Sequence, residues 1–300
     1  MMEIVFVGLA LLSIAVACGF LFEGVERKLF ARFQNRKGPP VLQPLYDALK
    51  LLFVKETVIP VNASTPVFII APYVSVAAVI TAVLLIPLGG AAPPLAFSGD
   101  LIVLVYVLAL STAALFLGAS ASGSPFAALG ASREMTLYIS LELSLALAIL
   151  APAFAADSFS MTAIYSRGAF LPLAAIVFFV AALAELGKKP FDISEAEQEI
   201  AEGLYAEYSG RLLGMFKIAN ALKHYVYASV FAALFIPIPM NWPIEVKVAA
   251  QLASAFIFIC TIAFVRGVSA RTRIHGASRF YMSLMAVLAL IQILLVYLWR

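Results

Sequence analysis

Charge is scarce in this 300-residue chain, where only 12% of the residues are Asp, Glu, Lys or Arg. A soluble globular domain carries about 25%. Hydrophobic residues reach 63%, and the mean hydropathy is +1.01. The shortage of charge excludes a soluble fold and indicates an integral membrane protein, which we read as one helical domain over residues 1–300. The net charge of +3 is too small for a nucleic-acid footprint.

Cysteine and histidine are also scarce, with two of each. Cys18 and Cys260 both fall inside apolar runs, whereas an iron–sulfur cluster generally needs four thiolates. His224 and His275 lie near no cysteine in the sequence, so structural zinc is not expected either. We therefore predict no catalytic, cofactor-binding or metal-binding residue in this chain, and place any redox cofactor in a partner subunit.

Long apolar runs, by contrast, are abundant. Each of eight runs approaches the roughly 20 residues that a helix needs to cross a bilayer. We predict an all-α, polytopic membrane protein with about eight transmembrane helices. The runs cover about residues 3–25, 66–88, 100–121, 137–156, 169–187, 214–236, 244–266 and 280–299.

The basic residues predict the orientation of these spans. Fifteen Lys and Arg residues fall in four of the predicted loops, against three on the opposite face. Because positive charge is retained on the cytoplasmic side, we predict that both termini lie outside. The cytoplasmic loops are then 26–65, 122–136, 188–213 and 266–279.

The first of these loops contains a short amphipathic pattern. After Pro39 and Pro40, apolar residues recur at helical spacing, and they are Leu42, Leu45, Leu49, Leu52 and Phe53. A helix of this length is too short to span, so we expect it to lie along the membrane surface. Gln43, Asp47 and Lys50 fall toward its other side. The helix is then either a plain interfacial anchor or the wall of a cavity where a soluble partner docks.

The stretch 185–211 is the most acidic part of the chain. It holds seven of the seventeen carboxylates, namely Glu185, Asp192, Glu195, Glu197, Glu199, Glu202 and Glu207. Pro190 should end the arriving helix, and Ser194 with Glu197 has the form of a capping box that starts another. On that new helix Glu195, Glu199 and Glu202 would share one face.

No Lys or Arg occurs between Pro190 and Gly210 to neutralise these acids. Crowded carboxylates raise one another's pKa values, which suits groups that exchange protons or small cations. An ordinary solvated loop is the alternative interpretation. A carboxylate run on the side of the membrane where cations are expected favours a helical acidic loop with a functional role.

Several polar residues fall inside the predicted spans. An unpaired charge at membrane depth costs about 2.5–3.5 kcal/mol on insertion scales, so such groups usually pair or line water. We predict that Glu142 and Lys217 belong to a hydrated ion path. Lys217 begins a polar stripe that also includes Asn220, His224 and Tyr227. His224 alone can be a packing residue, and Glu185 can snorkel to the surface.

Two stretches of this chain resemble one protein family. Ala184-Glu185, Pro190-Phe191-Asp192 and the acids that follow resemble the acidic loop in the H subunit of respiratory complex I. Gly38-Pro39 and Leu42-Gln43-Pro44-Leu45 resemble the first cytoplasmic loop of that subunit. The direct passage between these two motifs, without a longer insertion, is similar to the homologous subunit of membrane-bound, energy-converting nickel–iron hydrogenases. We favour this hydrogenase-type branch.

The resemblance implies a non-catalytic anchor and coupling subunit in a prokaryotic cell membrane, which links electron transfer in a peripheral arm to translocation of protons or sodium ions. The implied partners are hydrogenase-like large and small subunits, a ferredoxin-like iron–sulfur subunit and antiporter-like membrane subunits. A nickel–iron centre and iron–sulfur clusters would lie in those partners, with ferredoxin as electron donor. The acids of 185–211, Glu142, Lys217 and His224 would form the coupling path. The residues facing the soluble subunits or the cavity mouth would be Arg27, Arg36, Lys37, Gln43, Asp47 and Lys50.

Three alternatives remain beside this interpretation. The chain can be the H subunit of a quinone-reducing complex, in which the same cavity admits a quinone tail. It can be a stand-alone secondary transporter, although it shows no internal repeat of the kind on which many transporters are built. It can also be a passive anchor whose charged loops only dock soluble subunits.

Overall fold

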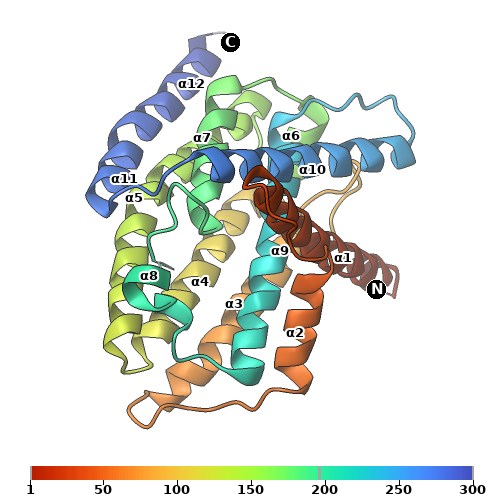
Figure 1. Cartoon of the computed structure of the whole chain (residues 1–300). Coiled ribbons are helices and arrows are strands. Elements are labelled where there is room, and N and C mark those ends of the chain that lie inside the picture. The colour runs from red at the N-terminus through yellow and green to blue at the C-terminus, as the bar shows by residue number, and fades with distance from the viewer. Residues whose placement is uncertain (1, 195–196, 299–300) are drawn as a thin grey trace.

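The computed structural model describes residues 2–194 and 197–298, and these residues form helices, turns and loops without a β-strand (Figure 1). The long helices are α1 (Met2–Phe33), α3 (Thr65–Leu85), α4 (Asp100–Ser120), α5 (Pro125–Ala156), α7 (Pro172–Glu185), α9 (Gly210–Phe235), α10 (Ile244–Val268) and α12 (Ala286–Leu298). The short elements are α2 (Gln43–Phe53), α6 (Met161–Arg167), α8 (Glu197–Ile200), the 3₁₀ turn η1 (Gly203–Tyr205), α11 (Ile274–Phe280) and the π-helical turn η2 (Tyr281–Met285).

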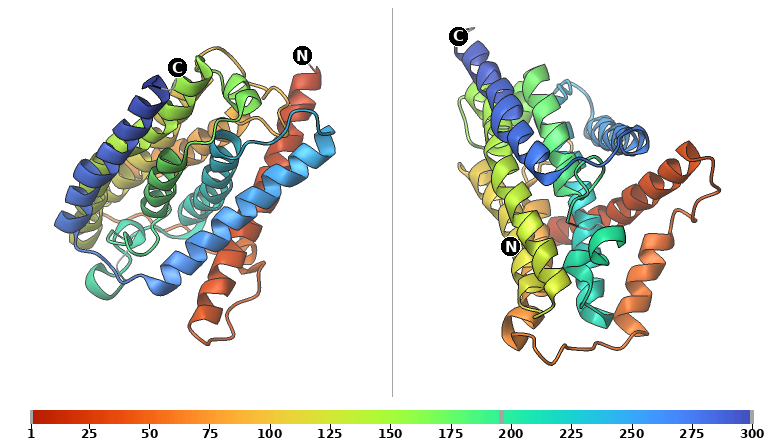
Figure 2. Two further views of the ribbon diagram at one scale, coloured as in Figure 1. Left: turned by 90° about the horizontal axis from the view of Figure 1, so that it is seen from above. Right: turned by 60° about the vertical axis from the view of Figure 1, so that its left-hand side comes forward.

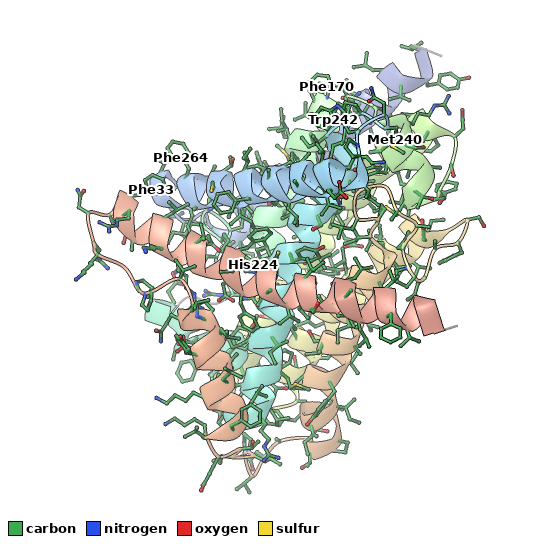
Figure 3. All side chains as sticks on the ribbon, turned by 90° about the vertical axis from the view of Figure 1, so that its right-hand side faces the viewer. Phe33, Phe170, His224, Met240, Trp242 and Phe264 are labelled. Atoms are coloured by element: carbon green, nitrogen blue, oxygen red, sulfur yellow. The ribbon has the colours of Figure 1, made fainter. Side chains whose placement is uncertain are left out.

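Helix α9 lies at the centre of the bundle. Figures 1 and 2 show α3, α4, α5 and α7 on one side of it, with α12 packed outside α5 and α7. Helices α1 and α10 cross α9 on the other side and pack against each other. The ends of α1 and α10 that the sequence predicts to be cytoplasmic lie close together. There the rings of Phe33 and Phe264 lie edge to face, with 5.8 Å between their centroids (Figure 3).

The helical content confirms the predicted all-α membrane fold. Six helical stretches of the described chain are long and apolar enough to cross a membrane: α1, α3, α4, α5, α10 and the continuous run Ile274–Leu298. Helix α7 has only 14 residues, about 21 Å at the usual rise. Helix α9 has 26 residues but carries polar side chains along its length. Each of the eight predicted spans thus contains a helix, whereas the number that cross the bilayer remains a prediction.

Two helices extend further into the predicted cytoplasmic loops than expected. Helix α1 continues to Phe33, which makes Glu26 and Arg27 helical. Helix α5 begins at Pro125, so most of the predicted loop 122–136 is helix. Proline is favoured in a first turn because its missing N–H would have no partner there. Apolar runs predict where a chain can cross a bilayer, but they do not mark where a helix stops.

The acidic stretch differs from its prediction. Helix α7 ends at Glu185 and not at Pro190, because Gly187 adopts a φ of +62° and the N–H of Lys188 bonds back to the carbonyl of Leu183. The predicted helix after Ser194 is reduced to the four residues of α8. Ala201 and Glu202 then take positive φ angles of 49° and 65°, which ends it.

The predicted shared face of Glu195, Glu199 and Glu202 is therefore wrong, since Glu199 and Glu202 lie on different sides of this break. Glu195 lies outside the described residues, and Glu197 begins α8. The Ser194–Glu197 capping box rests on a side chain outside the described set.

We expect Gly24→Ala to destabilise the fold, because a Cβ at this position would lie 1.7 Å from the carbonyl oxygen of Val41. That oxygen belongs to the backbone leading into α2, so relief of the clash would require a shift of the backbone of α1 or of this segment. Overpacking of this kind usually costs about 1–3 kcal/mol of unfolding free energy. Thermal unfolding in detergent should show a lower midpoint for this variant. Gly276→Ala is the control, because no atom lies within 4 Å of the place that its Cβ would take, and an equal loss in both variants would contradict the proposed close contact.

Candidate functional site

A charged cavity of about 780 Å³ opens where α1, α9, α10 and the segment after α7 meet. Among the described residues, three carboxylates line it, from Glu23, Asp192 and Glu199. The cations in its wall are twice as many: Arg27, Lys188, Lys189, Lys217, Arg266 and Arg271. The cavity therefore has a surplus of positive charge, although the sequence around it is acidic.

The acids of the 185–211 stretch are paired with cations from other parts of the chain. Arg271 Nη2 lies 3.0 Å from Asp192 Oδ2, and Arg133 Nη1 lies 2.7 Å from Glu199 Oε2. Thr272 also donates both its backbone N–H and its hydroxyl to the carbonyl oxygen of Pro190. The prediction that these crowded carboxylates raise one another's pKa values is thus wrong at Glu199, because the Arg133 guanidinium holds the pKa of that carboxyl below its usual value.

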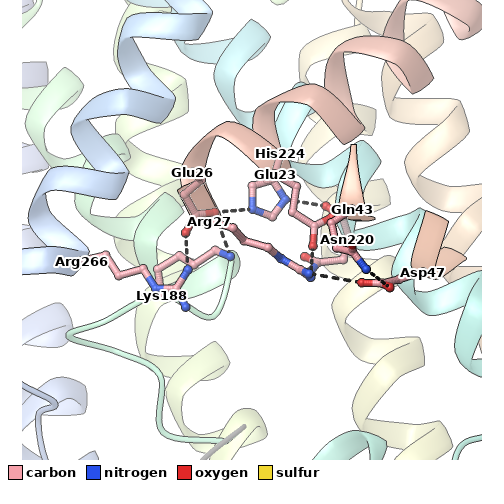
Figure 4. Close-up of polar contacts among 9 residues, drawn as sticks. All are labelled: Glu23, Glu26, Arg27, Gln43, Asp47, Lys188, Asn220, His224 and Arg266. Atoms are coloured by element: carbon pink, nitrogen blue, oxygen red, sulfur yellow. Dashed lines mark hydrogen bonds and ion pairs between the residues drawn. The ribbon is translucent and has the colours of Figure 1, made fainter. Parts of the chain in front are cut away.

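Glu26 is the most completely buried carboxylate of the site, with no exposed side-chain surface (Figure 4). Its Oε2 lies 2.9 Å from Lys188 Nζ and 3.1 Å from His224 Nε2. Its Oε1 accepts a hydrogen bond of 2.7 Å from Arg266. One carboxylate from α1 is thereby joined to α9, α10 and the segment after α7.

A second network connects α1 to the amphipathic helix α2. Arg27 donates to Glu23 at 2.5 Å and lies 3.7 Å from Asp47, which in turn accepts from Gln43 at 2.9 Å (Figure 4). Arg27, Gln43 and Asp47 of the predicted docking set therefore lie together at the side of the charged cavity. The remaining members of that set, Arg36, Lys37 and Lys50, are exposed elsewhere and form no ion pair with a described residue.

Deeper in the bundle, a buried cluster surrounds Glu185. Lys223 Nζ donates to Thr112 Oγ1 at 2.8 Å, and that hydroxyl donates to Glu185 Oε2 at 3.0 Å. The Glu185 carboxylate also interacts electrostatically with Tyr227 and with Glu142. Glu142 is hydrogen bonded by Tyr138, one turn earlier on α5. The predicted ion-path residues Glu142 and Glu185 are thus brought together.

A small inner cavity lies between this cluster and the charged cavity. It is about 30 Å³ in volume, enough for a water molecule, and Glu134, Glu185 and Lys223 line it. Gly187 and Asn220 line both cavities. A continuous series of polar groups therefore leads from the charged cavity to Glu142.

The other predicted path residues lie apart from this cluster. Lys217 is in the wall of the charged cavity, with its ammonium group 5.0 Å from the centre of the Tyr205 ring. Glu202 is exposed and Glu207 half-buried, and among the described residues neither forms an ion pair. His224 faces Glu26 rather than the Glu185 cluster.

Several residues of the site were not predicted from the sequence. They include Glu26, Thr112 and Lys223, and the cations Arg133, Lys188, Arg266 and Arg271. Glu26 lies just past the predicted end of the first span, where a charged residue is unremarkable. Lys223 is adjacent to His224 and lies inside an apolar run, and this same signal selected Lys217. No group of three or more potential metal ligands occurs in the part of the chain that the structure describes.

The fold and the site together define a polytopic, all-helical membrane protein with a buried chain of carboxylates and cations. The chain belongs to the NADH dehydrogenase family, whose model matches residues 5–297. This confirms the resemblance seen in the two loop motifs.

Relatives come from both branches of this family. The chain is 36% identical over 252 residues to hydrogenase-4 component C of Escherichia coli, covering 82% of this chain and 79% of the relative. It is 39% identical over 236 residues to formate hydrogenlyase subunit 4 of the same organism, covering 76% of each. It is 37% identical over 303 residues to the H subunit of NADH-quinone oxidoreductase from Syntrophotalea carbinolica, covering 91% of this chain and 89% of the relative.

A solved structure supports the same placement. A chain of the membrane-bound sulfane sulfur reductase, an archaeal respiratory membrane complex, superposes with a TM-score of 0.89 at 29% identity. The match covers 98% of this chain and 99% of the other. The relatives are therefore membrane components of hydrogenase and respiratory complexes.

We expect Arg133→Gln to raise the pKa of Glu199 toward the ordinary value of about 4.3, since the Arg133 charge is what lowers it. A carboxyl with a lowered pKa contributes stability above its ordinary pKa and loses it as the pH falls through the lowered value. The Arg133–Glu199 pair should therefore persist at pH 5 and be lost only in stronger acid. Carboxyl ¹³C chemical shifts during a pH titration, assigned with Glu199→Gln, measure this directly. An identical Glu199 titration with and without Arg133 would contradict the pairing.

Proposed function

We propose that this chain is the membrane-anchor and coupling subunit of a hydrogenase-type, energy-converting redox complex. It carries no redox chemistry itself. Soluble hydrogenase-like subunits and a ferredoxin-like iron–sulfur subunit dock on its cytoplasmic face and hold the nickel–iron centre and the iron–sulfur clusters. Antiporter-like membrane subunits, packed beside it, move protons or sodium ions. Its similarity to two hydrogenase components of E. coli supports this branch.

The observation that carries the proposal is that the two cavities are adjacent and share wall residues. The charged cavity lies at the predicted cytoplasmic face, where a soluble arm would sit, and the inner cavity reaches Glu185 at the end of α7. Because they share Gly187 and Asn220, a change of charge or position at the mouth acts on groups that lie deep in the bundle. Passive docking would not require this buried series of titratable residues.

The stretch from the last residue of α7 to Asp192 is the element that would transmit such a change. Within eight residues it carries Glu185 of the inner cluster, Lys188 of the Glu26 cluster and Asp192 at the cavity mouth. A displacement of Asp192 from Arg271 therefore moves a backbone that also holds the two inner groups. Coupling of this kind requires two states of the segment with different affinities for an ion.

An apolar cavity supports a second candidate, the H subunit of a quinone-reducing complex. It has a volume of about 570 Å³ and lies between α1 and α2, with Phe20, Leu21 and Leu45 in its wall. Its shape and lining suit an isoprenoid tail. Quinone that co-purifies with the intact complex, or inhibition by quinone-site inhibitors, would favour this candidate, whereas bound nickel would favour the hydrogenase branch.

We expect Glu185→Gln and Glu142→Gln to lower ion translocation by at least about tenfold while the complex remains assembled. Both changes remove a titratable group from the inner cluster and keep its size. Electron transfer and ion uptake, measured in parallel on inverted membrane vesicles, separate coupling from redox activity. The matched control is Glu245→Gln, because Glu245 is exposed in the first turn of α10, at the opposite end of this helix from the charged cavity.

Normal ion uptake in both inner-cluster variants would contradict the coupling role and favour a passive anchor. Transport by the chain reconstituted alone would instead favour a secondary transporter.

A further inference from the structure

His224 makes two hydrogen bonds that together specify where its protons are. Its side chain is fully buried on α9, between α1 and α10 (Figure 3). Nδ1 lies 2.7 Å from the backbone carbonyl oxygen of Asn220. A carbonyl oxygen only accepts hydrogen bonds, so Nδ1 must carry a proton.

The second nitrogen, Nε2, lies 3.1 Å from Glu26 Oε2. If both atoms lacked a proton, two lone pairs would face each other in a dry environment. In the arrangement that the structure describes, one proton therefore lies between them, either on Nε2 as an imidazolium or on Oε2 as a neutral carboxyl; loss of this proton would require the two atoms to separate. The two forms differ only in which atom holds the same proton.

We propose that Glu26 and His224 form a buried site that binds one exchangeable proton, and that Lys188 sets its affinity. This inference rests on the proposed coupling function and deepens it by naming the ion and a place where it is held. The site suits a proton and not a sodium ion. Sodium takes oxygen ligands, whereas N–H groups of Lys188, Arg266 and His224 already surround the Glu26 carboxylate (Figure 4).

The charges around the pair explain how the protein would control this proton. Lys188 approaches from the segment after α7, Arg266 from α10 and the Glu23–Arg27 pair from α1, while Lys223 neighbours His224 on α9. Arg266 and Arg27 lie on long helices, but Lys188 lies on the short segment that also carries Asp192. Lys188 is thus the cation that moves if that segment moves.

Movement of Lys188 changes proton binding in a definite direction. A positive neighbour disfavours an added proton, so withdrawal of Lys188 strengthens proton binding and its return releases the proton. By thermodynamic linkage, proton binding at Glu26–His224 weakens the attraction between this site and the Lys188 ammonium group by the same free energy. The position of the segment after α7 and the proton occupancy of the Glu26–His224 site are then coupled through Lys188 alone.

The test uses the full chain in lipid nanodiscs with ¹⁵N-labelled histidine. The chain has only two histidines, and His275 is exposed on α11, so His275→Gln leaves His224 as the single signal. We expect Nδ1 to remain protonated from pH 5 to pH 9 while Nε2 titrates. Lys188→Gln should raise the midpoint by about one unit or more, and Lys188→Arg should leave it near the wild-type value.

Three results would overturn the proposal: a His224 that lacks the Nδ1 proton, one that stays doubly protonated throughout this range, or a midpoint that does not respond to Lys188→Gln. A second measurement applies if the labelled chain does not give resolved signals. In the intact complex, ion translocation is measured as a function of pH. Lys188→Gln should shift one step of this profile to higher pH, and His224→Gln should abolish that step. An unchanged profile in both variants would also overturn the proposal. Failure here with normal sensitivity to Glu185→Gln would leave the coupling function standing.

Discussion

The burial of the Glu26 carboxylate is the constraint on which the surrounding structure depends. An ionised group without a partner in a dry interior costs several kcal/mol, so this carboxylate can exist only if cations reach it. They come from α10 and from the segment after α7, while α9 supplies His224. Three elements that are distant in the sequence must therefore converge on one turn of α1. The charged cavity opens at this convergence, and Lys188 and Arg266 form part of its wall.

The need of a carboxylate for cationic partners also explains the ion pairs of the acidic stretch 185–211. The free-energy cost of an unpaired carboxylate is lower there, because these acids are partly solvated. Asp192 and Glu199 pair with Arg271, which follows α10, and with Arg133 of α5. These pairs connect the segment after α7 to two separate parts of the surface that the sequence predicts to be cytoplasmic. Exposed pairs contribute little to stability, so they can be exchanged for contacts with a docked subunit. The buried ion pairs of Glu26 cannot be replaced so easily by contacts with another subunit, so we expect them to persist when the partly exposed pairs break.

Apolar runs predicted the position of every long helix, because burial in lipid demands a long stretch of apolar residues whatever the tertiary contacts. They also made Glu142, Glu185 and His224 conspicuous, since a polar residue within such a run is anomalous. They could not reveal partners, because Glu26 and His224 are 198 residues apart and Arg133 and Glu199 are 66 apart. Glu26 was not recognised because it lies at the edge of an apolar run, where a charged residue is expected. The break at Ala201 and Glu202 was equally unpredictable, since neither residue type favours a positive φ.

The charge of the cavity bears on which ion this site handles. The sequence is acidic here, yet the folded cavity wall has six cations against three carboxylates. Part of this positive charge is balanced, because Lys188 and Arg266 pair with Glu26 behind the wall. A sodium ion and a proton meet the same field, but a sodium ion must also shed its water for oxygen ligands. A proton can instead pass along hydrogen bonds, such as those that Lys223 donates to Thr112 and Thr112 donates to Glu185. The hydrogen-bonded interior is consistent with the proposed proton site, and the positive charge in the cavity wall is what an anionic face of a docked subunit would neutralise.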